Sequence, residues 1–327
     1  MKVLYGYKNL QGKLKDPVVA IGIFDGIHIG HKRVIKKVLS AKKSAQESVI
    51  LTFDPHPQIT LRPDKTPPRI MSLEHRLFIF EKMGIDAAIV IRFTDFIASM
   101  TPEDFIKKVI CVIGAKKIYV GINFHFGSAR SGNVEIFKKI ARDYGIDVCT
   151  VRPVKLGRRV VSSTWLRKLI CRGKIEKAET LLRRPVSILG RVVVGARRGK
   201  TIGIPTANID PCQETIPPPG VYAVKIDIGC KFYDGVINIG FNPTFYGKRL
   251  KRRKEPQIEA HLIGFRGDLY GSLIEIFFIK KIRKEKTFKG EENLKKQIEK
   301  DIGKAEKILL NKKILMKIKR YKYCLQK

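Results

Sequence analysis

Two histidines stand three residues apart in the segment GIFDGIHIGHKR, which begins at Gly22 and follows a strand-like apolar run. On a helix, His28 and His31 would lie on one face near its N-terminus. A helix N-terminus carries partial positive charge and unpaired N–H groups, and it therefore favours phosphate. Two imidazoles directed at one anionic group can stabilise the charge that builds on phosphorus during substitution. The segment therefore predicts a phosphate site where a strand meets a helix.

Three other interpretations of the histidine pair remain open. One ring could pack in the core while the other faces solvent. HxGH sites also occur in class I aminoacyl-tRNA synthetases, but those carry a second loop of the KMSKS type, and RIMSLE is a poor substitute for it. A metal site is the weakest interpretation, because no carboxylate or third ligand accompanies the pair at a spacing typical of zinc.

A second candidate phosphate site is the segment GARRGKTIGIPTAN, from Gly195 to Asn208. Three residues instead of four separate Gly195 and Gly199, so the segment does not match a P-loop. Pro205 also prevents a helix from starting directly after it. The glycines can expose backbone N–H groups to phosphate, and Lys200 adds a point charge. Taken alone, the segment is explained equally well as a basic β-turn.

The composition predicts a cytoplasmic globular protein that attracts anions. The chain has 66 Lys and Arg against 30 Asp and Glu, a formal charge of +36. This charge favours nucleic acid, an anionic membrane or a phosphorylated small molecule, and composition does not choose among them. The 6 cysteines lack ligand-like spacing, which favours free thiols in a reducing compartment. No apolar run approaches the roughly 18 residues of a membrane span, and the first residues lack a signal-peptide core.

Residues 1–184 alternate strand-like and helix-like segments. The apolar runs VVAIGIF, SVILTF, AAIVIRF, KIYVGI and IDVCTV are short and rich in β-branched residues. Helical patterns such as HKRVIKKVLSAKKSAQE and NVEIFKKIARDYG lie between several of them. The alternation predicts an α/β domain, a parallel sheet with helices on both faces. One long helical pattern, SSTWLRKLICRGKIEKAETLLRR, ends before Pro185.

Residues 185–310 have a different pattern, in which turns separate strand-like runs such as VSILGRVVVG, GVYAVKIDIG and GSLIEIFFIKKI. This pattern predicts an antiparallel sheet or small barrel, with one closing helix over EENLKKQIEKDIGKAEKILL. Residues 311–327 contain seven Lys or Arg and no acidic residue. Such a composition favours a solvated, basic C-terminal tail.

Several motifs together resemble the bacterial bifunctional riboflavin kinase/FAD synthetase family. GIFDGIHIGH, LTFDPHP, GINFHFGSARSG and VSSTWLR are similar to its adenylyltransferase half, a Rossmann-like nucleotidyltransferase domain. GKTIGIPTAN, GVYAV, GVINIGFNPTF, IEAHL, GDLYG and RKEKTF are similar to its kinase half, a β-barrel, in the same order. The resemblance implies that ATP phosphorylates riboflavin to FMN, and that a second ATP adenylylates FMN to give FAD and pyrophosphate. It also implies that Mg²⁺ accompanies ATP.

In the first half, the resemblance implies that the following residues contact ATP: Phe24, Asp25, Gly26, His28, His31, Ser163, Thr164 and Arg167. His28 and His31 would be the catalytic pair, while Asn123 and Phe124 would line the flavin site. A simple N-cap at Ser163 and a surface charge at Arg167 are the alternatives for those two residues taken singly. His56, in the DPHP segment, could equally be structural or catalytic. FMN phosphate is already anionic, so this site requires alignment and charge stabilisation but no base.

In the second half, the resemblance implies that the following residues bind the nucleotide: Gly195, Gly199, Lys200, Thr206 and Asn208. Thr206 and Asn208 offer neutral oxygens that suit Mg²⁺ held mainly by phosphates. The flavin would lie against Arg283, Glu285 and Phe288. Glu259 would be the base for the riboflavin 5′-hydroxyl, a poor nucleophile at neutral pH. The plain alternative for Glu259 is a strand residue on a solvated face.

The sequence departs from the family pattern at a few positions, including Ile23, where many relatives have Asn, and His125, where many have Arg. The effect of His125 on flavin affinity stays open, as do the oligomeric state, the relative rates and reversibility of the two reactions, and the reason for the basic charge. The competing hypothesis is a nucleic-acid-binding protein on a nucleotidyltransferase scaffold. It is disfavoured because only Tyr321 and Tyr323 supply aromatic side chains within the basic tail. The expected partners are ATP, riboflavin and FMN, with no membrane.

Overall fold

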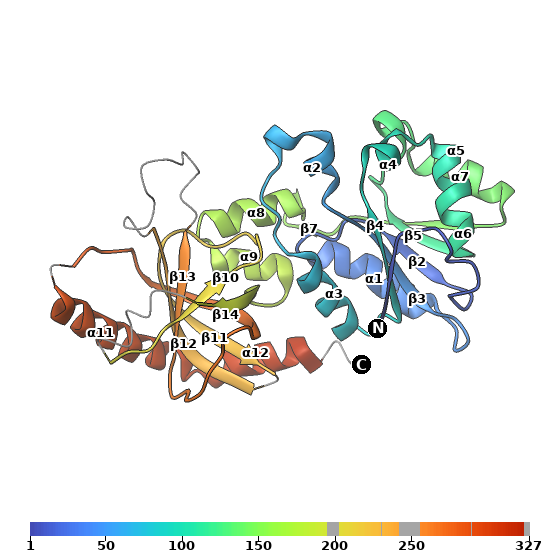
Figure 1. The fold of residues 1–327 in the computed structure, drawn as a ribbon. Helices are drawn as coiled ribbons and strands as arrows, with labels where there is room; N and C mark the ends of the chain where they lie inside the picture. Colours follow the sequence, from blue (N-terminus) through green and yellow to red (C-terminus); the bar gives the residue numbers. More distant parts are fainter. Residues whose placement is uncertain (195–202, 230, 242–255, 289, 324–327) are drawn as a thin grey trace. The chain divides into compact units, whose positions relative to one another are not determined.

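The computed structural model describes residues 1–194, 203–229, 231–241, 256–288 and 290–323. Contacts divide the chain into two compact units. The first contains Met1–Arg69, Leu73–Ser163 and the C-terminal residues from Lys322, and the second contains Ile70–Ser72 and Thr164–Tyr321. Figure 1 shows the chain coloured from blue at the N-terminus to red at the C-terminus. Within the described ranges, none of the helices combines the length and the hydropathy that a membrane span requires.

The first unit is built on a six-stranded sheet and the helices between its strands. The strands are β1 (Lys2–Tyr5), β2 (Val18–Ile21), β3 (Ser48–Asp54), β4 (Ala87–Arg92), β5 (Lys117–Gly121) and β6 (Asp147–Val151), with a small hairpin of β7 (Lys155–Leu156) and β8 (Arg159–Val160). The helices are α1 (Ile29–Ala41), α2 (Pro57–Leu61), α3 (Leu73–Lys82), α4 (Asp95–Ser99), α5 (Pro102–Phe105), α6 (Cys111–Ile113) and α7 (Val134–Asp143). A π-helical segment, η2 (Ile106–Ile110), joins α5 to α6, and the 3₁₀ turns are η1 (Pro63–Lys65) and η3 (Ser128–Arg130).

All neighbouring strands of this sheet are parallel, in the order β1-β4-β3-β2-β5-β6. On one face, α1 packs against β2, β3 and β5 and buries Val34, Ile35 and Val38. On the other face, residues of η2 and α7, among them Val109 and Phe137, share a core with alternate residues of the strands. Helices therefore cover both faces, because the apolar strands have no solvated side. The predicted parallel α/β domain is confirmed.

The second unit contains two helices, a barrel and two further helices. Its elements are α8 (Ser163–Cys171), α9 (Ile175–Leu182), β9 (Val186–Val193), β10 (Ala207–Asp210), β11 (Gly220–Ile228), β12 (Lys231–Gly240), β13 (Gln257–Leu262), β14 (Leu273–Arg283), α11 (Glu291–Leu309) and α12 (Lys312–Tyr323). The six strands form a closed barrel in the order β10-β13-β12-β11-β14-β9, and every pairing is antiparallel. Helix α11 packs on the outside, with Ala305 and Leu309 against Val221 and Val236. The predicted antiparallel barrel with a closing helix is confirmed.

The long helical pattern before Pro185 forms two helices rather than one. The break falls at Gly173, between α8 and α9, where φ is +67°. Only glycine adopts this left-handed conformation without strain. A side chain there would also meet Pro218, with Cβ 3.1 Å from Cγ. Helical periodicity continues through the break, so the pattern alone does not reveal it.

The basic C-terminal segment is helical over most of its length. Helix α12 spans Lys312–Tyr323, although the composition of residues 311–327 favours a solvated tail. Ile318 is fully buried, and Lys317 forms an ion pair with Glu179 of α9 at 2.9 Å. This part of the chain is therefore packed against the second unit through α12.

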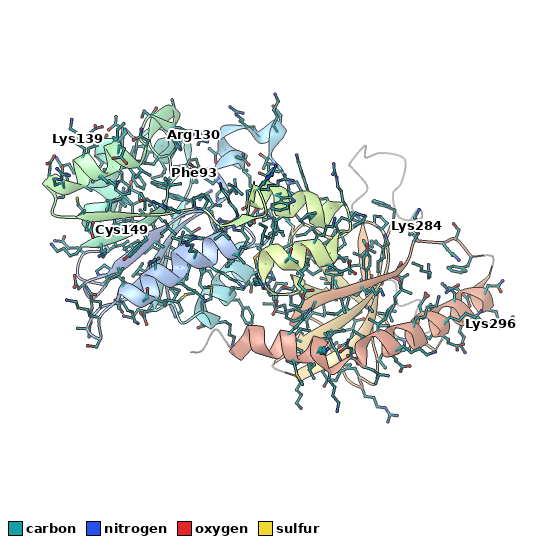
Figure 2. All side chains as sticks on the ribbon, turned by 180° about the vertical axis from the view of Figure 1, so that it is seen from behind. Phe93, Arg130, Lys139, Cys149, Lys284 and Lys296 are labelled. Carbon is teal, nitrogen blue, oxygen red and sulfur yellow. The ribbon has the colours of Figure 1, made fainter. Side chains whose placement is uncertain are left out.

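The charged side chains labelled in Figure 2 lie on the outside of their units: Arg130, Lys139, Lys284 and Lys296 are all exposed. Arg76 and Arg167 are the contrast, with 3% and 9% of their surface exposed. A buried guanidinium requires hydrogen-bond or ionic partners, since its desolvation is costly. The buried arginines therefore mark places where the fold supplies polar partners for a buried charge.

Candidate active sites

The sheet of the first unit has its topological switch point between β2 and β5. From β2 the chain proceeds to β3 and β4 on one side, and then returns to β5 and β6 on the other. Ligands of open α/β sheets bind at such a point, outside the carboxyl ends of the strands. The loop after β2 carries the histidine segment, and the loop after β5 carries Asn123 and Phe124. The structure therefore brings these two segments to the same edge of the sheet.

The two histidines lie together at the N-terminus of α1. His28 is the N-cap, and its Nδ1 accepts the backbone N–H of His31 at 3.3 Å. The rings stack with centroids 3.7 Å apart and an interplanar angle of 19°. Gly30 leaves room for this arrangement, because a Cβ there would lie 3.1 Å from the His28 ring. The imidazoles thus share the helix end that favours anions.

Both rings are neutral at physiological pH. Burial lowers the pKa of His28 to about 4 from its ordinary 6.5. Burial, with the neighbouring charges of His28 and Arg76, lowers the pKa of His31 well below 6.5. Because Nδ1 of His28 is the cap acceptor, the neutral ring carries its proton on Nε2. His28 therefore meets a ligand as a neutral N–H donor.

The remaining residues of the histidine loop are held by packing and by long-range hydrogen bonds. Phe24 and Asp25 are buried, and Gly26 has φ +84°. The Ser163 hydroxyl donates to the carbonyl of Asp25 at 2.8 Å. Two segments expected to contact ATP, 138 positions apart in sequence, are thus in direct contact.

Thr164 and Arg167 belong to α8 and, by contacts, to the second unit. Thr164 is exposed, whereas Arg167 is 9% exposed. The alternative that Arg167 is a surface charge is therefore wrong. His56 has a structural role, since its Nδ1 accepts the Gln58 N–H at 3.2 Å and caps α2.

The loop after β5 contributes to an aromatic cluster at the edge of the core. The Phe124 ring stacks on Phe126, with centroids 5.6 Å apart, and lies 6.0 Å from Phe137. Asn123 is exposed, and its carbonyl lies 2.9 Å from Nδ1 of His125. His125, an exposed residue at the position where many relatives have Arg, is thus folded back onto its own loop.

In the second unit, Glu259 lies in the middle of a polar row. On β13 it is directly opposite Asn208 of β10 and Asn238 of β12. Directly opposite residues of antiparallel strands share a face. Ile258 and Ala260, its neighbours along β13, are buried inside the barrel. The carboxylate and the two amides therefore share the outer face, an arrangement compatible both with a base and with the plain alternative of a strand residue on a solvated face.

The row continues around the barrel to Arg283. Asn238 is opposite Val221, and Val221 is opposite Arg283 of β14. The Arg283 Nε donates to Asp301 of α11 at 2.8 Å, and the guanidinium lies 5.6 Å from the centre of the Phe288 ring. Arg283 and Phe288, both expected near the flavin, are therefore in mutual contact.

Glu285 lies close to the same face. A Cβ built on Gly240, two residues after Asn238, would fall 3.0 Å from the Glu285 Cδ and 3.4 Å from the Asn238 amide nitrogen. The absence of a side chain at Gly240 therefore lets the Glu285 carboxylate approach β12 beside Asn238.

The glycine-rich segment is only partly within the described ranges. Gly195, Gly199 and Lys200 lie outside the described residues. Thr206 directly precedes β10 and is half-buried, and the Pro205 carbonyl lies 2.8 Å from Nδ1 of His261 on β13. This contact fixes the end of the segment beside the row that contains Glu259.

The oxygens near this row fit a hard cation. The Thr206 hydroxyl and the Asn208 amide would offer neutral oxygens to Mg²⁺ bound chiefly through nucleotide phosphates. Among the described residues, no group of three or more His, Cys, Asp and Glu side chains could hold a metal ion by itself. A protein-only metal cage is therefore not indicated in this part of the chain.

Four residues of these sites were not predicted from the sequence: Arg76 and Phe80 of α3, and Asn238 and Gly240 of β12. Asn238 falls within GVINIGFNPTF, and its position opposite IEAHL could have been inferred only with the strand register. Arg76 and Phe80 belong to an ordinary amphipathic pattern, SLEHRLFIFEKM, which carries no signal of a site.

Comparisons with known proteins agree with this organisation. The sequence models of the FAD synthetase and riboflavin kinase families match residues 10–165 and 182–309, respectively. A bifunctional riboflavin kinase/FMN adenylyltransferase of Bacillus subtilis is 37% identical over 302 residues, which cover 90% of this chain and 93% of the relative. The protein of that description from Buchnera aphidicola is 36% identical over 314 residues, covering 94% and 98%.

A solved structure from Streptococcus pneumoniae, described as a macrolide-efflux protein, is also similar. It has a TM-score of 0.78 and 30% sequence identity, and the match covers 93% of this chain and 98% of that one. That description applies to the Streptococcus pneumoniae protein. The structural similarity extends over both units of this chain. Because relatives above 30% identity match nine-tenths of its length, the chain belongs to the bifunctional riboflavin kinase/FMN adenylyltransferase family.

Proposed function

We propose that each half of the chain carries one of the two activities of its family, at the residues described above. ATP phosphorylates riboflavin to FMN on the barrel, and ATP adenylylates FMN to FAD at the switch-point loops, with release of pyrophosphate. One observation carries this assignment: the barrel row has a carboxylate between two amides, whereas the loops present two neutral imidazoles. An alcohol needs a base to become a nucleophile, and an ionised phosphate does not.

At the switch point, an oxygen of the FMN phosphate attacks the α-phosphorus of ATP. The bond between that phosphorus and the oxygen bridging to the β-phosphate breaks, and pyrophosphate leaves. His28 and His31 donate N–H groups to phosphate oxygens as negative charge builds on them. The other residues assigned to ATP are Phe24, Asp25, Gly26, Ser163, Thr164 and Arg167. Asn123 and Phe124 line the flavin side, where an aromatic ring offers a stacking surface.

On the barrel, Glu259 accepts the proton of the riboflavin 5′-hydroxyl while the oxygen attacks the γ-phosphorus and ADP leaves. Asn208 and Asn238 flank Glu259 on the two neighbouring strands. The residues assigned to the nucleotide are Gly195, Gly199, Lys200, Thr206 and Asn208, and those assigned to the flavin are Arg283, Glu285 and Phe288. Thr206 and Asn208 would hold Mg²⁺, which offsets phosphate charge when bound with ATP.

The division of the chain that goes with this assignment is 1–184 for adenylyl transfer, 185–310 for the kinase and 311–327 as a basic C-terminal segment. The start of the barrel at Val186 supports the first boundary. A cytoplasmic location agrees with the substrates and with the free thiols of Cys111, Cys149 and Cys171. Nucleic acid is not among the proposed partners, despite the charge of +36.

The test is an incubation of purified protein with riboflavin, ATP and Mg²⁺, followed by chromatographic separation of the flavins. Both FMN and FAD should form. If folded protein yields neither product, the proposed function is wrong. Tight, steeply salt-dependent binding of RNA or DNA that is still present at physiological salt would favour the competing hypothesis, whereas binding that vanishes at physiological salt would indicate general surface charge.

A further inference from the structure

We propose that Arg76 of α3 is a positioning residue for adenylyl transfer, which acts by holding the histidine loop in its binding conformation. The proposal rests on the proposed function of that loop. It concerns a residue outside the motifs that identify the family, and one that does not reach the reacting atoms. Phe80, one turn further along α3, supports the same loop from the same helix face.

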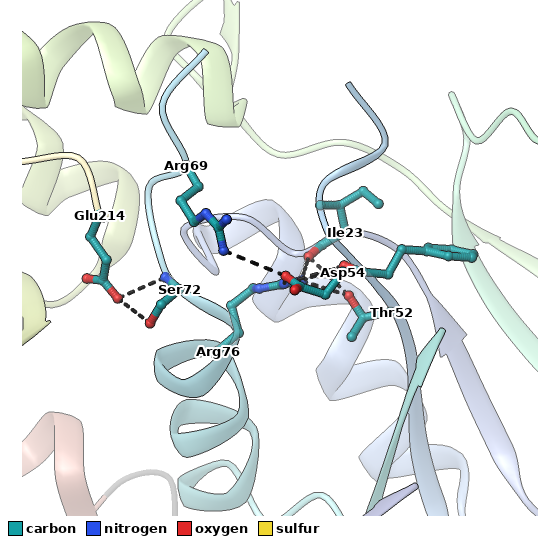
Figure 3. Close-up of polar contacts among 8 residues, drawn as sticks. Ile23, Thr52, Asp54, Arg69, Ser72, Arg76 and Glu214 are labelled. Atoms are coloured by element: carbon teal, nitrogen blue, oxygen red, sulfur yellow. Dashed lines mark hydrogen bonds and ion pairs between the residues drawn. The ribbon is translucent and has the colours of Figure 1, made fainter. Parts of the chain in front are cut away.

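Arg76 binds two separate segments of the first unit (Figure 3). Its Nη1 donates to the Ile23 carbonyl at 2.7 Å and to Oγ1 of Thr52 at 2.9 Å. Its Nη2 donates to Oδ1 of Asp54 at 3.0 Å, and both nitrogens lie 3.4 Å from the Phe53 carbonyl. The guanidinium thereby joins α3 to the histidine loop and to the carboxyl end of β3.

The histidine loop has a conformation that requires such support. Phe24 and Ile27 have φ of +56° and +40°, in the left-handed region that non-glycine residues rarely adopt. A backbone of this kind is strained and persists only where its surroundings fix it. The carbonyl that Arg76 binds belongs to Ile23, immediately before the first of these residues.

A chain of ring contacts connects α3 to both histidines. Phe80 meets Phe24 edge to face, with centroids 5.7 Å apart. Phe24 in turn meets His31 edge to face at 5.4 Å, and His31 stacks on His28. One face of α3 therefore holds the loop twice, by a hydrogen bond to its backbone and by packing against its aromatic ring.

The burial of Arg76 indicates that the residue positions the histidine loop and does not itself contact the substrate. The residue is 3% exposed, and both terminal nitrogens are engaged by protein acceptors. The Asp54 carboxylate balances the charge of Arg76. Nη1 of Arg69 lies 3.8 Å from the same carboxylate oxygen, Oδ1. Such a guanidinium is not free to clamp a phosphate, and its effect on the reaction must pass through the loop.

The charge of Arg76 has a second measurable effect, on the pKa of His31. Burial is the main cause that lowers the pKa of His31, and the neighbouring His28 ring and the Arg76 charge lower it further; of these two, only Arg76 is charged at physiological pH. Loss of the positive charge should therefore raise the pKa of His31. The acid limb of FMN adenylylation should then move to higher pH, whereas an Arg76→Lys variant, which keeps the charge, should leave that limb in place.

The experiment compares the full-length Arg76→Gln and Arg76→Lys variants, with Arg69→Gln as the matched control. FMN adenylylation and riboflavin phosphorylation are measured separately on each. We expect Arg76→Gln to lower kcat for adenylylation about 10- to 100-fold, with a smaller change in KM for ATP, because misplacement of catalytic groups by about 1 Å costs up to 100-fold. Arg76→Lys should recover part of the rate. Arg69→Gln removes a half-buried charge 3.8 Å from the same Asp54 oxygen and should stay within about threefold of wild type, because so long an ion pair contributes little.

Riboflavin phosphorylation is the internal control and should be unchanged in all three variants. The proposal is overturned if Arg76→Gln keeps wild-type adenylylation, or if both activities fall in parallel in Arg76→Gln and Arg76→Lys, which indicates general destabilisation. A wild-type protein that forms no FAD would instead contradict the proposed function itself. The two failures are therefore distinguishable.

Discussion

The two proposed sites would prepare an attack on phosphorus by opposite means. In the first unit, two stacked imidazoles sit at a helix N-terminus, in a loop of strained backbone held by a buried arginine. In the second, a carboxylate and two amides lie in register on the outer face of a barrel, where the backbone is regular. The first depends on the conformation of a loop, and the second depends on strand register.

The nucleophiles account for this difference. FMN brings its own negative charge to adenylyl transfer, so neutral donors that stabilise charge in the transition state suffice. Riboflavin brings an alcohol, which must lose a proton, so the kinase site needs a base placed within reach. A loop can be adjusted to the phosphates it surrounds, whereas a base on a strand has a fixed position and direction.

The largest effect should come from removing the base. Glu259→Gln should lower riboflavin phosphorylation by about a hundred- to ten-thousand-fold, the range of general base catalysis. The adenylylation of supplied FMN should not change. Chromatographic separation of FMN and FAD measures both. If the variant still forms FMN at the wild-type rate, Glu259 is not the base of the kinase reaction.

The histidine loop allows a test that separates capping from catalysis. His28→Asn keeps an acceptor for the His31 N–H but loses the Nε2 donor, so adenylylation should fall about 100-fold while stability is retained. His28→Ala loses both and should be less stable by about 1 kcal/mol. The paired His28→Ala, His31→Ala variant should form FMN but no FAD. Equal rates for His28→Asn and wild type would show that the ring serves only as a cap.

Acid should weaken the protein through the same histidine. The folded pKa of His28 is about 4 against an ordinary 6.5, so below pH 6.5 the unfolded chain takes up a proton that the folded chain does not. The stabilising contribution is complete above 6.5 and is lost as the pH falls towards 4; it is on the order of 3 kcal/mol. Denaturant unfolding across this range should show a shallower pH dependence in His28→Asn. Parallel curves would contradict the assignment of a buried neutral ring.

The smallest effect should come from Gly240→Ala. The new methyl group would displace the Glu285 carboxylate, whose side chain is exposed and can move at little cost in stability. We expect KM for riboflavin to rise about three- to tenfold, a loss of about 1 kcal/mol, with adenylylation unchanged. Measurement of KM in both reactions tests this, and an unchanged KM for riboflavin would place Glu285 outside the flavin site.

Much of this organisation could be predicted from the sequence. The alternation of apolar runs and helical patterns predicted the parallel domain, and the change near residue 185 predicted the barrel, because burial imposes a period on each kind of element. The position of His28 and His31 at a helix start followed from local spacing. The break at Gly173 and the packing of α12 did not follow, since both depend on contacts with distant parts of the chain.

The sequence by itself determined the residue types of both sites and the elements that carry them, because helix periodicity and motif spacing are local properties. Only the tertiary structure decided that Asn208, Glu259 and Asn238 form one row, and that Arg76 holds a loop fifty-three positions before it. Strand register and the partners of a buried charge are set by pairings between distant segments. Such pairings are chosen by the free energy of the whole fold, which no local pattern contains.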